Sequence, residues 1–164
     1  MSARKMHVAG ALFCVAAMGV ALYLQYGLGQ EPCPLCILQR FAMIALGTFF
    51  LLAAIHNPNR FGQHFYGLLQ FAAAAAGIAV AGRHVWLQSL PADQVPACGP
   101  GYDYLMENFP LLDAFSVIFR GSGECATIGW SFHGITLPQL TLAAFVVLFL
   151  WVLLLQWRVV KRHQ

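Results

Sequence analysis

The chain has 164 residues, of which 60% are hydrophobic and 9% are charged, and its formal net charge at pH 7 is +3. Because an average soluble domain carries about 25% charged residues, this chain lacks the polar residues that would cover a water-soluble globule. The small net charge, with no basic cluster among exposed aromatic residues, also argues against nucleic acid as a partner. The composition therefore predicts a membrane protein of one domain.

Four apolar stretches are candidates for membrane-spanning helices, since a helix needs about 20 apolar residues to cross a bilayer. They cover residues 8–28, 36–55, 65–82 and 137–157, and the connections at 29–35 and 83–136 lie on one side. The predicted fold class is an all-α membrane protein, a bundle of four transmembrane helices with one long loop. The whole chain, residues 1–164, forms its single membrane domain.

The first stretch follows Arg4 and Lys5, a charged start that also resembles a secretory signal peptide. Its apolar run is longer than the about 7–15 residues usual in a signal peptide, and no Ala-x-Ala cleavage motif follows it. We therefore expect this stretch to remain part of the protein as its first helix.

Lysine and arginine residues set the expected orientation, because they are enriched in cytoplasmic loops. The side that holds the termini carries Arg4, Lys5, Arg60, Arg158, Lys161 and Arg162, and the other side carries Arg40, Arg83 and Arg120. Both termini are therefore expected in the cytoplasm, and the connections 29–35 and 83–136 are expected outside it.

Cys33 and Cys36 form a Cys-x-x-Cys pair where a polar turn meets the second apolar stretch. Two intervening residues let the sulfurs cycle between dithiol and disulfide. A purely stabilising disulfide is a poor interpretation, because closing so short a loop removes little chain entropy. Haem attachment is excluded because Ile37, rather than histidine, follows the pair. Structural zinc usually takes two close-spaced pairs, and this is the only one in the sequence, so we expect no metal.

Arg40 lies four residues after Cys36, so the two side chains share one face of a helix that begins near Pro34. The positive end of the helix dipole and the guanidinium would both favour the thiolate form of Cys36, which is the reactive form. Arg40 could instead extend to the lipid headgroups. A charged side chain near the apolar zone is nevertheless a functional candidate, and its spacing from Cys36 supports that interpretation.

His84 follows the third apolar stretch on the same outer side. An imidazole there can donate a hydrogen bond to the carbonyl of a lipid-soluble electron acceptor, or relay protons. The alternative is an interfacial histidine with no role. Both interpretations remain open from the sequence.

Three further cysteines complete the set. Cys14 lies inside the first apolar stretch, where a cysteine behaves as a small hydrophobic residue. Cys98 and Cys125 lie in the long outer loop. Four outer cysteines allow three pairings, and the economical one joins Cys33 to Cys36 and Cys98 to Cys125. For the loop pair, a stabilising disulfide and a redox role remain equally open.

The loop segment 109–120 contains apolar residues at a roughly helical spacing. Such a segment could lie flat on the membrane surface. It could equally form a small core that packs the loop against itself, and the sequence favours neither.

Together these residues resemble the bacterial disulfide bond formation protein B (DsbB) family over almost the whole chain. The resemblance rests on the Cys-x-x-Cys-Ile-x-x-Arg motif of Cys33, Cys36, Ile37 and Arg40, on His84, and on the two loop cysteines and four spans. It implies a thiol:quinone oxidoreductase of the bacterial inner membrane that reoxidises a periplasmic DsbA-like thiol oxidase. Ubiquinone or menaquinone would accept the electrons beside Arg40 and His84, and no metal would be needed.

The resemblance also implies an order of events. The reduced partner would attack a Cys98–Cys125 disulfide at Cys98, and the released Cys125 would attack Cys33. Cys36 would then leave as a thiolate and pass electrons to a quinone near Arg40.

Two other classes of protein remain possible from the sequence. One is a non-enzymatic membrane protein whose outer loop is held by disulfides to bind a partner. The other is a quinone reductase of the vitamin K epoxide reductase type. The latter places its Cys-x-x-Cys after the loop pair, whereas here it comes first.

Overall fold

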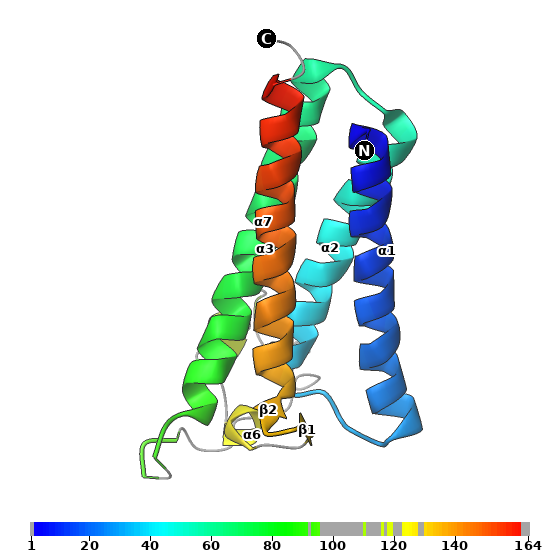
Figure 1. The fold of residues 1–164 in the computed structure, drawn as a ribbon. Coiled ribbons are helices and arrows are strands. Elements are labelled where there is room, and N and C mark those ends of the chain that lie inside the picture. The colour runs from blue at the N-terminus through cyan, green and yellow to red at the C-terminus, as the bar shows by residue number, and fades with distance from the viewer. Residues whose placement is uncertain are drawn as a thin grey trace.

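The computed structural model describes residues 2–91, 93–95, 110, 116, 118–119, 123–127 and 130–161. The elements are α1 (Ala3–Leu22), the π-helix η1 (Tyr23–Gly27), α2 (Pro34–His56), α3 (Arg60–Gln88), α6 (Gly123–Ala126), β1 (Ser131–Phe132), β2 (Ile135–Thr136) and α7 (Leu137–Lys161). The four long helices run side by side, and both chain termini lie at the same end of the bundle (Figure 1). The α1–α2 connection, α6 and the β1–β2 hairpin lie at the other end, here called the thiol end.

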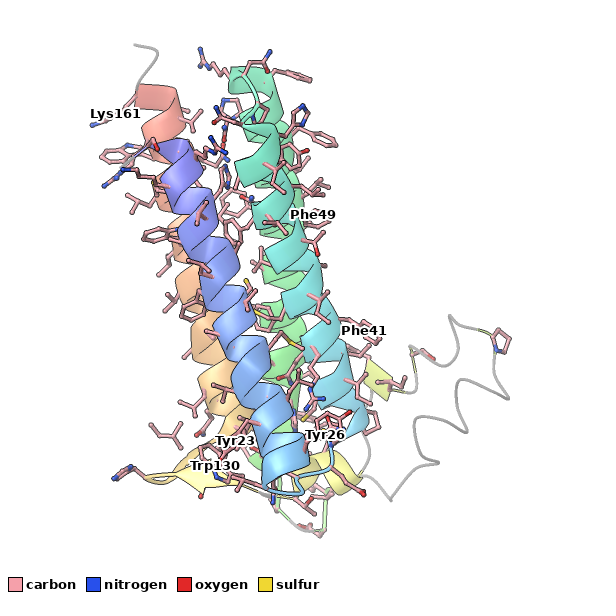
Figure 2. All side chains as sticks on the ribbon, turned by 90° about the vertical axis from the view of Figure 1, so that its right-hand side faces the viewer. Tyr23, Tyr26, Phe41, Phe49, Trp130 and Lys161 are labelled. Atoms are coloured by element: carbon pink, nitrogen blue, oxygen red, sulfur yellow. The ribbon has the colours of Figure 1, made fainter. Side chains whose placement is uncertain are left out.

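All four long helices have the length and apolar composition needed to cross a membrane, with α1 counted together with η1. They contain 25, 23, 29 and 25 residues, which exceeds the about 20 residues required. The all-α, four-helix membrane fold predicted from the sequence is therefore confirmed. Figure 2 shows Tyr23, Tyr26 and Trp130 gathered at the thiol end, as expected for aromatic side chains at a membrane surface.

The third helix is longer than the apolar stretch 65–82, since α3 continues to Gln88. In the turns after Gly82, Leu87 is fully buried, and the Arg83 guanidinium stacks on the Trp86 ring, 4.1 Å from its centroid. Proline disfavours helix in the residue before it, and the first proline after this helix is Pro91. His84 therefore lies within the helix, not beyond its end.

Capping residues define both ends of α2. Pro34 occupies the first helical position, where its missing N–H is not needed, and the Sγ atom of Cys33 accepts a hydrogen bond from the Cys36 N–H at 3.4 Å. Asn57 ends the helix in the left-handed conformation, with φ of 41°. Asn59 then begins α3 by accepting a hydrogen bond from the Gly62 N–H at 3.2 Å.

Small residues let α3 approach α7 closely. Ala74 is fully buried, and a Cβ atom on Gly77 would overlap the Phe145 ring of α7. Side chains of this size allow helix backbones to approach in a lipid environment.

A buried polar cluster ties α1 to α3 at the end of the bundle that holds the termini. The side chains of His7 and Gln70 are fully buried. The ring Nε2 of His7 lies 2.9 Å from the Gln63 Oε1 atom, and its Nδ1 lies 3.2 Å from the Gln70 Nε2 atom. Because a buried polar group is costly unless it is hydrogen-bonded, these contacts fix where α1 sits along α3.

Parts of the predicted outer loop lie outside the described residues. These parts include Cys98 and most of the segment 109–120. Within that segment, Ile118 is buried and Phe119 is exposed.

Candidate functional site

The Cys-x-x-Cys pair lies at the first turn of α2, at the thiol end. Cys33 caps the helix and Cys36 sits in its first turn, with 3.1 Å between the two Sγ atoms. The short Cys33-Pro34-Leu35-Cys36 stretch brings the sulfurs together because Pro34 fixes the first helical turn. The pair therefore sits at the positive end of the helix dipole, as predicted.

His84 of α3 contacts both cysteines of this pair. Its Nε2 atom lies 3.7 Å from the Cys33 Sγ atom, and its Nδ1 atom lies 3.9 Å from the Cys36 Sγ atom. The same Nε2 lies 3.0 Å from the Cys125 carbonyl oxygen, and Nδ1 lies 3.0 Å from the Gln39 Nε2 atom. The tautomer with its proton on Nε2 satisfies both of these contacts, donating to the carbonyl and accepting from the amide.

Cys125 reaches the pair from the short helix α6. It is fully buried and packs with Leu35 of α2 and Leu87 of α3. The Sγ atoms of Cys125 and Cys33 and a ring nitrogen of His84 all lie within 4.8 Å of one another. Residues from three separated parts of the chain thus meet at one point.

The surroundings of Cys33 favour its protonated form. The pKa of the Cys33 thiol is raised above its ordinary range, most strongly by a hydrogen bond with Cys125, next by one with Cys36, and also by burial. A thiol that keeps its proton is a poor nucleophile. In this arrangement Cys33 is therefore suited to be attacked once it is oxidised, not to attack.

Arg40 is anchored to the end of the first helix. Its guanidinium donates hydrogen bonds to the Gln25 Oε1 atom and to the Ala21 carbonyl oxygen, the latter at 3.2 Å. Gln25 lies in the π-helix η1, and such local widening of a helix is frequent at functional sites. These bonds tie the guanidinium to the end of the first helix.

A cavity of about 340 Å³ opens beside the thiols between α1, α2, α3 and α7. Cys33, Cys36, Arg40 and His84 line it, and most of the remaining wall is apolar, including Met18, Leu24, Met43, Leu140 and Ala144. Pockets for small organic ligands have this size range and this mixture of apolar walls with a few polar groups. The walls suit a lipid-soluble ring compound, with polar contacts at one edge.

The structure thus brings together five of the six residues proposed from the sequence. Cys33, Cys36, Arg40 and His84 line one cavity, and Cys125 lies behind Cys33; Cys98 lies outside the described residues. Sequence reasoning missed Gln39, whose buried amide orients the His84 ring. The available signal was a polar residue inside an apolar stretch, three positions after Cys36.

The fold and the site together define a multi-pass membrane protein with clustered thiols next to an apolar cavity. The family model described as "Disulfide bond formation protein DsbB" matches residues 3–155. This chain belongs to that family, which confirms the resemblance seen in the sequence. Its members act in disulfide bond formation, an oxidation of thiols.

Several curated proteins named "Disulfide bond formation protein B" are similar over most of their length. The protein from Nitrosococcus oceani is 51% identical over 148 residues, which cover 90% of this chain and 88% of that one. The protein from Methylobacillus flagellatus is 51% identical over 152 residues, covering 93% and 92%. The protein from Chromobacterium violaceum is 50% identical over 151 residues, covering 92% and 89%.

Proposed function

We propose that this protein is a thiol:quinone oxidoreductase that reoxidises a periplasmic DsbA-like thiol oxidase. Electrons pass through the pairs Cys98–Cys125 and Cys33–Cys36 to ubiquinone, or to menaquinone where that is the membrane quinone. The observation that carries the proposal is the convergence of Cys33, Cys36 and Cys125 beside an apolar cavity.

The first steps are two thiol–disulfide exchanges. A thiolate of the reduced partner attacks Cys98, forms a mixed disulfide there and releases Cys125 as a thiolate. Cys125 then attacks Cys33, so the Cys33–Cys125 bond forms while the Cys33–Cys36 bond breaks. The electron pair of the broken bond stays on Cys36 as a thiolate. Support for this exchange comes from the Cys125 and Cys33 sulfurs, which lie within 4.8 Å of each other.

His84 and Leu35 support the exchange by fixing Cys125. The N–H of His84 holds the Cys125 carbonyl at 3.0 Å, and Leu35 packs against Cys125. A reacting atom held in position needs less reorganisation to reach its target. Both contacts therefore favour attack on Cys33.

The cavity residues fit a quinone as the electron acceptor. Its apolar walls suit a hydrophobic ring and chain, while Cys36, Arg40 and His84 supply polar groups at one edge. A bound quinone accepts two electrons and two protons. The guanidinium of Arg40, held by Gln25 and Ala21, stabilises negative charge that develops nearby.

The complete cycle balances without any other reactant. The partner's second thiol attacks the mixed disulfide, which leaves the partner oxidised and releases Cys98 as a thiolate. Cys98 then attacks Cys125, so the Cys98–Cys125 bond forms again while the Cys33–Cys125 bond breaks and releases Cys33. Cys33 and Cys36 rejoin as their two electrons pass to the quinone. The net reaction converts a dithiol and a quinone into a disulfide and a quinol.

The proposed location is the bacterial inner membrane, with both termini in the cytoplasm and the thiol end in the periplasm. The support is the distribution of lysine and arginine. Arg4, Lys5, Arg158 and Lys161 all lie toward the end of the bundle that holds the termini, and such residues favour the cytoplasmic side. A periplasmic thiol end meets an oxidising compartment that tolerates disulfides.

A direct assay tests the proposal. The protein is purified in detergent with ubiquinone, a reduced DsbA-like oxidase is added, and the quinone absorbance is followed. We expect quinone reduction in the unaltered protein and in Cys14→Ser, which changes a buried cysteine away from the site, but none in Cys36→Ser. Full activity in Cys98→Ser would exclude the two-pair relay, and no quinone reduction by the unaltered protein would exclude the activity itself.

A further inference from the structure

Cys33, His84 and Cys125 offer two sulfurs and one ring nitrogen within 4.8 Å of one another. Thiolate and imidazole are the ligands that Zn²⁺ and related soft divalent cations prefer. With Zn–S bonds of about 2.3 Å and Zn–N bonds of about 2.0 Å, the ligand atoms of a tetrahedral site lie about 3.5–3.8 Å apart. The 3.7 Å between Cys33 Sγ and His84 Nε2 matches that spacing.

Cys36 lies next to this set. Its Sγ lies 3.1 Å from Cys33 Sγ and 3.9 Å from the Nδ1 atom of His84, but it is not one of the three groups whose ligand atoms lie within 4.8 Å of one another. Two sulfurs and one nitrogen leave the fourth tetrahedral position to a water molecule, as in zinc sites with three protein ligands.

The surroundings of these three groups resemble those of an established metal site. His84 and Cys125 are 2% and 0% exposed, and Gln39 contacts the other ring nitrogen of His84 at 3.0 Å. Such an outer partner usually orients a metal-bound imidazole. With Nε2 on a metal, the proton moves to Nδ1, and the Gln39 amide turns so that its oxygen accepts it. The cavity that reaches Cys33 and Cys36 provides an entry path.

We infer that the reduced protein binds one soft divalent cation such as Zn²⁺ through Cys33, Cys125 and His84, and that the bound cation halts electron relay. The bound cation takes the place of the thiol protons. It also replaces the hydrogen bond between the His84 ring and the Cys125 carbonyl, and no electron is transferred. Oxidation of either cysteine pair to a disulfide removes ligands, so the site exists only in the reduced state. The inhibitory part of this inference rests on the proposed function, because the relay uses the same thiols.

Cobalt titration tests the site without any need for turnover. The full-length protein is reduced, freed of reductant without air, and titrated with Co²⁺. We expect one equivalent to give the thiolate-to-cobalt absorption and the visible bands of a tetrahedral site, and Zn²⁺ to bleach both. Cys125→Ser and His84→Gln should each weaken Co²⁺ binding by at least about tenfold. Cys14→Ser, whose cysteine lies in α1, should bind as the unaltered protein does.

Three results would overturn the inference: no thiolate-to-cobalt band in the reduced protein, an equally strong band in the oxidised protein, or the same Co²⁺ affinity in Cys125→Ser and the unaltered protein. Gln39→Leu provides a second variant if a ligand variant fails to fold, and it should weaken binding by about 10–100-fold.

Inhibition is measured separately in the quinone assay. Zn²⁺ should slow quinone reduction, and a chelator should restore it. Unchanged turnover with Zn²⁺ bound would refute the inhibitory part. If the protein reduces no quinone at all while the cobalt bands appear as expected, the proposed function fails and the metal site stands.

Discussion

His84 and Cys125 are joined by a hydrogen bond from the ring Nε2 of α3 to the main-chain carbonyl of α6, at 3.0 Å. The bond links a long helix of the bundle to the short helix α6, at the cysteine that attacks Cys33 in the proposed relay. A main-chain acceptor makes the contact independent of the redox state of the Cys125 sulfur. His84 therefore has a defined partner in the loop, in addition to its place on the cavity wall.

Replacing His84 should slow the meeting of Cys125 and Cys33. In a protein that also carries Cys36→Ser and Cys98→Ser, we expect His84→Leu to lower the rate of Cys33–Cys125 disulfide formation by about 2–10-fold. A hydrogen bond contributes about 0.5–1.5 kcal/mol, and its loss reduces the docked population accordingly. Non-reducing electrophoresis after addition of a mild oxidant measures the rate.

Two controls separate positioning from general destabilisation. His84→Gln keeps an N–H donor and should recover part of the rate. His56→Gln alters an exposed histidine at the far end of α2 and should leave the rate unchanged. Equal rates in His84→Leu and the unaltered protein would show that the carbonyl contact has no part in docking.

Replacing Arg40 should weaken use of the quinone. Arg40→Leu removes the guanidinium from the cavity wall and leaves the Gln25 and Ala21 oxygens without their donor. We expect the KM for ubiquinone to rise and kcat to fall, with kcat/KM lower by about tenfold or more, as for loss of a charged hydrogen-bonding group. Arg40→Lys should recover little, because a lysine cannot donate to both oxygens in the same geometry.

The matched control is Arg83→Leu, which alters another arginine at the thiol end that stacks on Trp86. Its quinone kinetics should match those of the unaltered protein. Equal loss in both variants would indicate a general charge effect instead of a role for Arg40.

The reduced protein should lose stability at alkaline pH. Because its neighbours raise the pKa of Cys33, folding keeps this thiol protonated where an unfolded cysteine, with a pKa of about 8.5, ionises. The contribution is fully present below about pH 8.5 and declines as the pH rises toward the folded value. Thermal unfolding in reductant between about pH 7 and 10 should show this decline, and Cys33→Ser should show a smaller one.

Gly77→Ala should destabilise the bundle, because the added Cβ atom would overlap the Phe145 ring. Overpacking of this kind costs about 1–3 kcal/mol, measurable as a lower unfolding temperature in detergent. Gly82→Ala is the matched control in the same helix, since its Cβ meets no atom within 4 Å, and it should be neutral or slightly stabilising. Gly77→Ala combined with Phe145→Leu should recover part of the loss.

The sequence predicts those parts of the site that depend on local spacing. A helix beginning at Pro34 places Cys33, Cys36 and Arg40 on the cavity side, because positions four apart share a helix face. The four apolar stretches likewise predict the bundle, since each is long enough to cross a bilayer.

Contacts between distant segments could not be read in this way. Nothing local indicates that His84 lies beside Cys125, because their meeting depends on how α6 packs against Leu35 and Leu87. The sequence also predicts the end of α3 too early, since hydropathy falls at Arg83 whereas the helical packing continues to Leu87. Sequence patterns report composition, and these contacts are decided by tertiary packing.

The first helix is held near both ends: by His7 with Gln63 and Gln70 at one end, and by Gln25 with Arg40 at the other. Between these two attachment points, α1 packs closely against α2 but makes few contacts with α7. The cavity lies along this loosely packed boundary between α1 and α7, here called the seam, and Ala17 of α1 and Ala144 of α7 line it. A small molecule dissolved among the lipid tails would meet this seam sideways, in the plane of the bilayer. In the proposed reaction, the quinone would therefore reach the site from the lipid and the partner protein from the aqueous side, by two perpendicular routes that do not overlap.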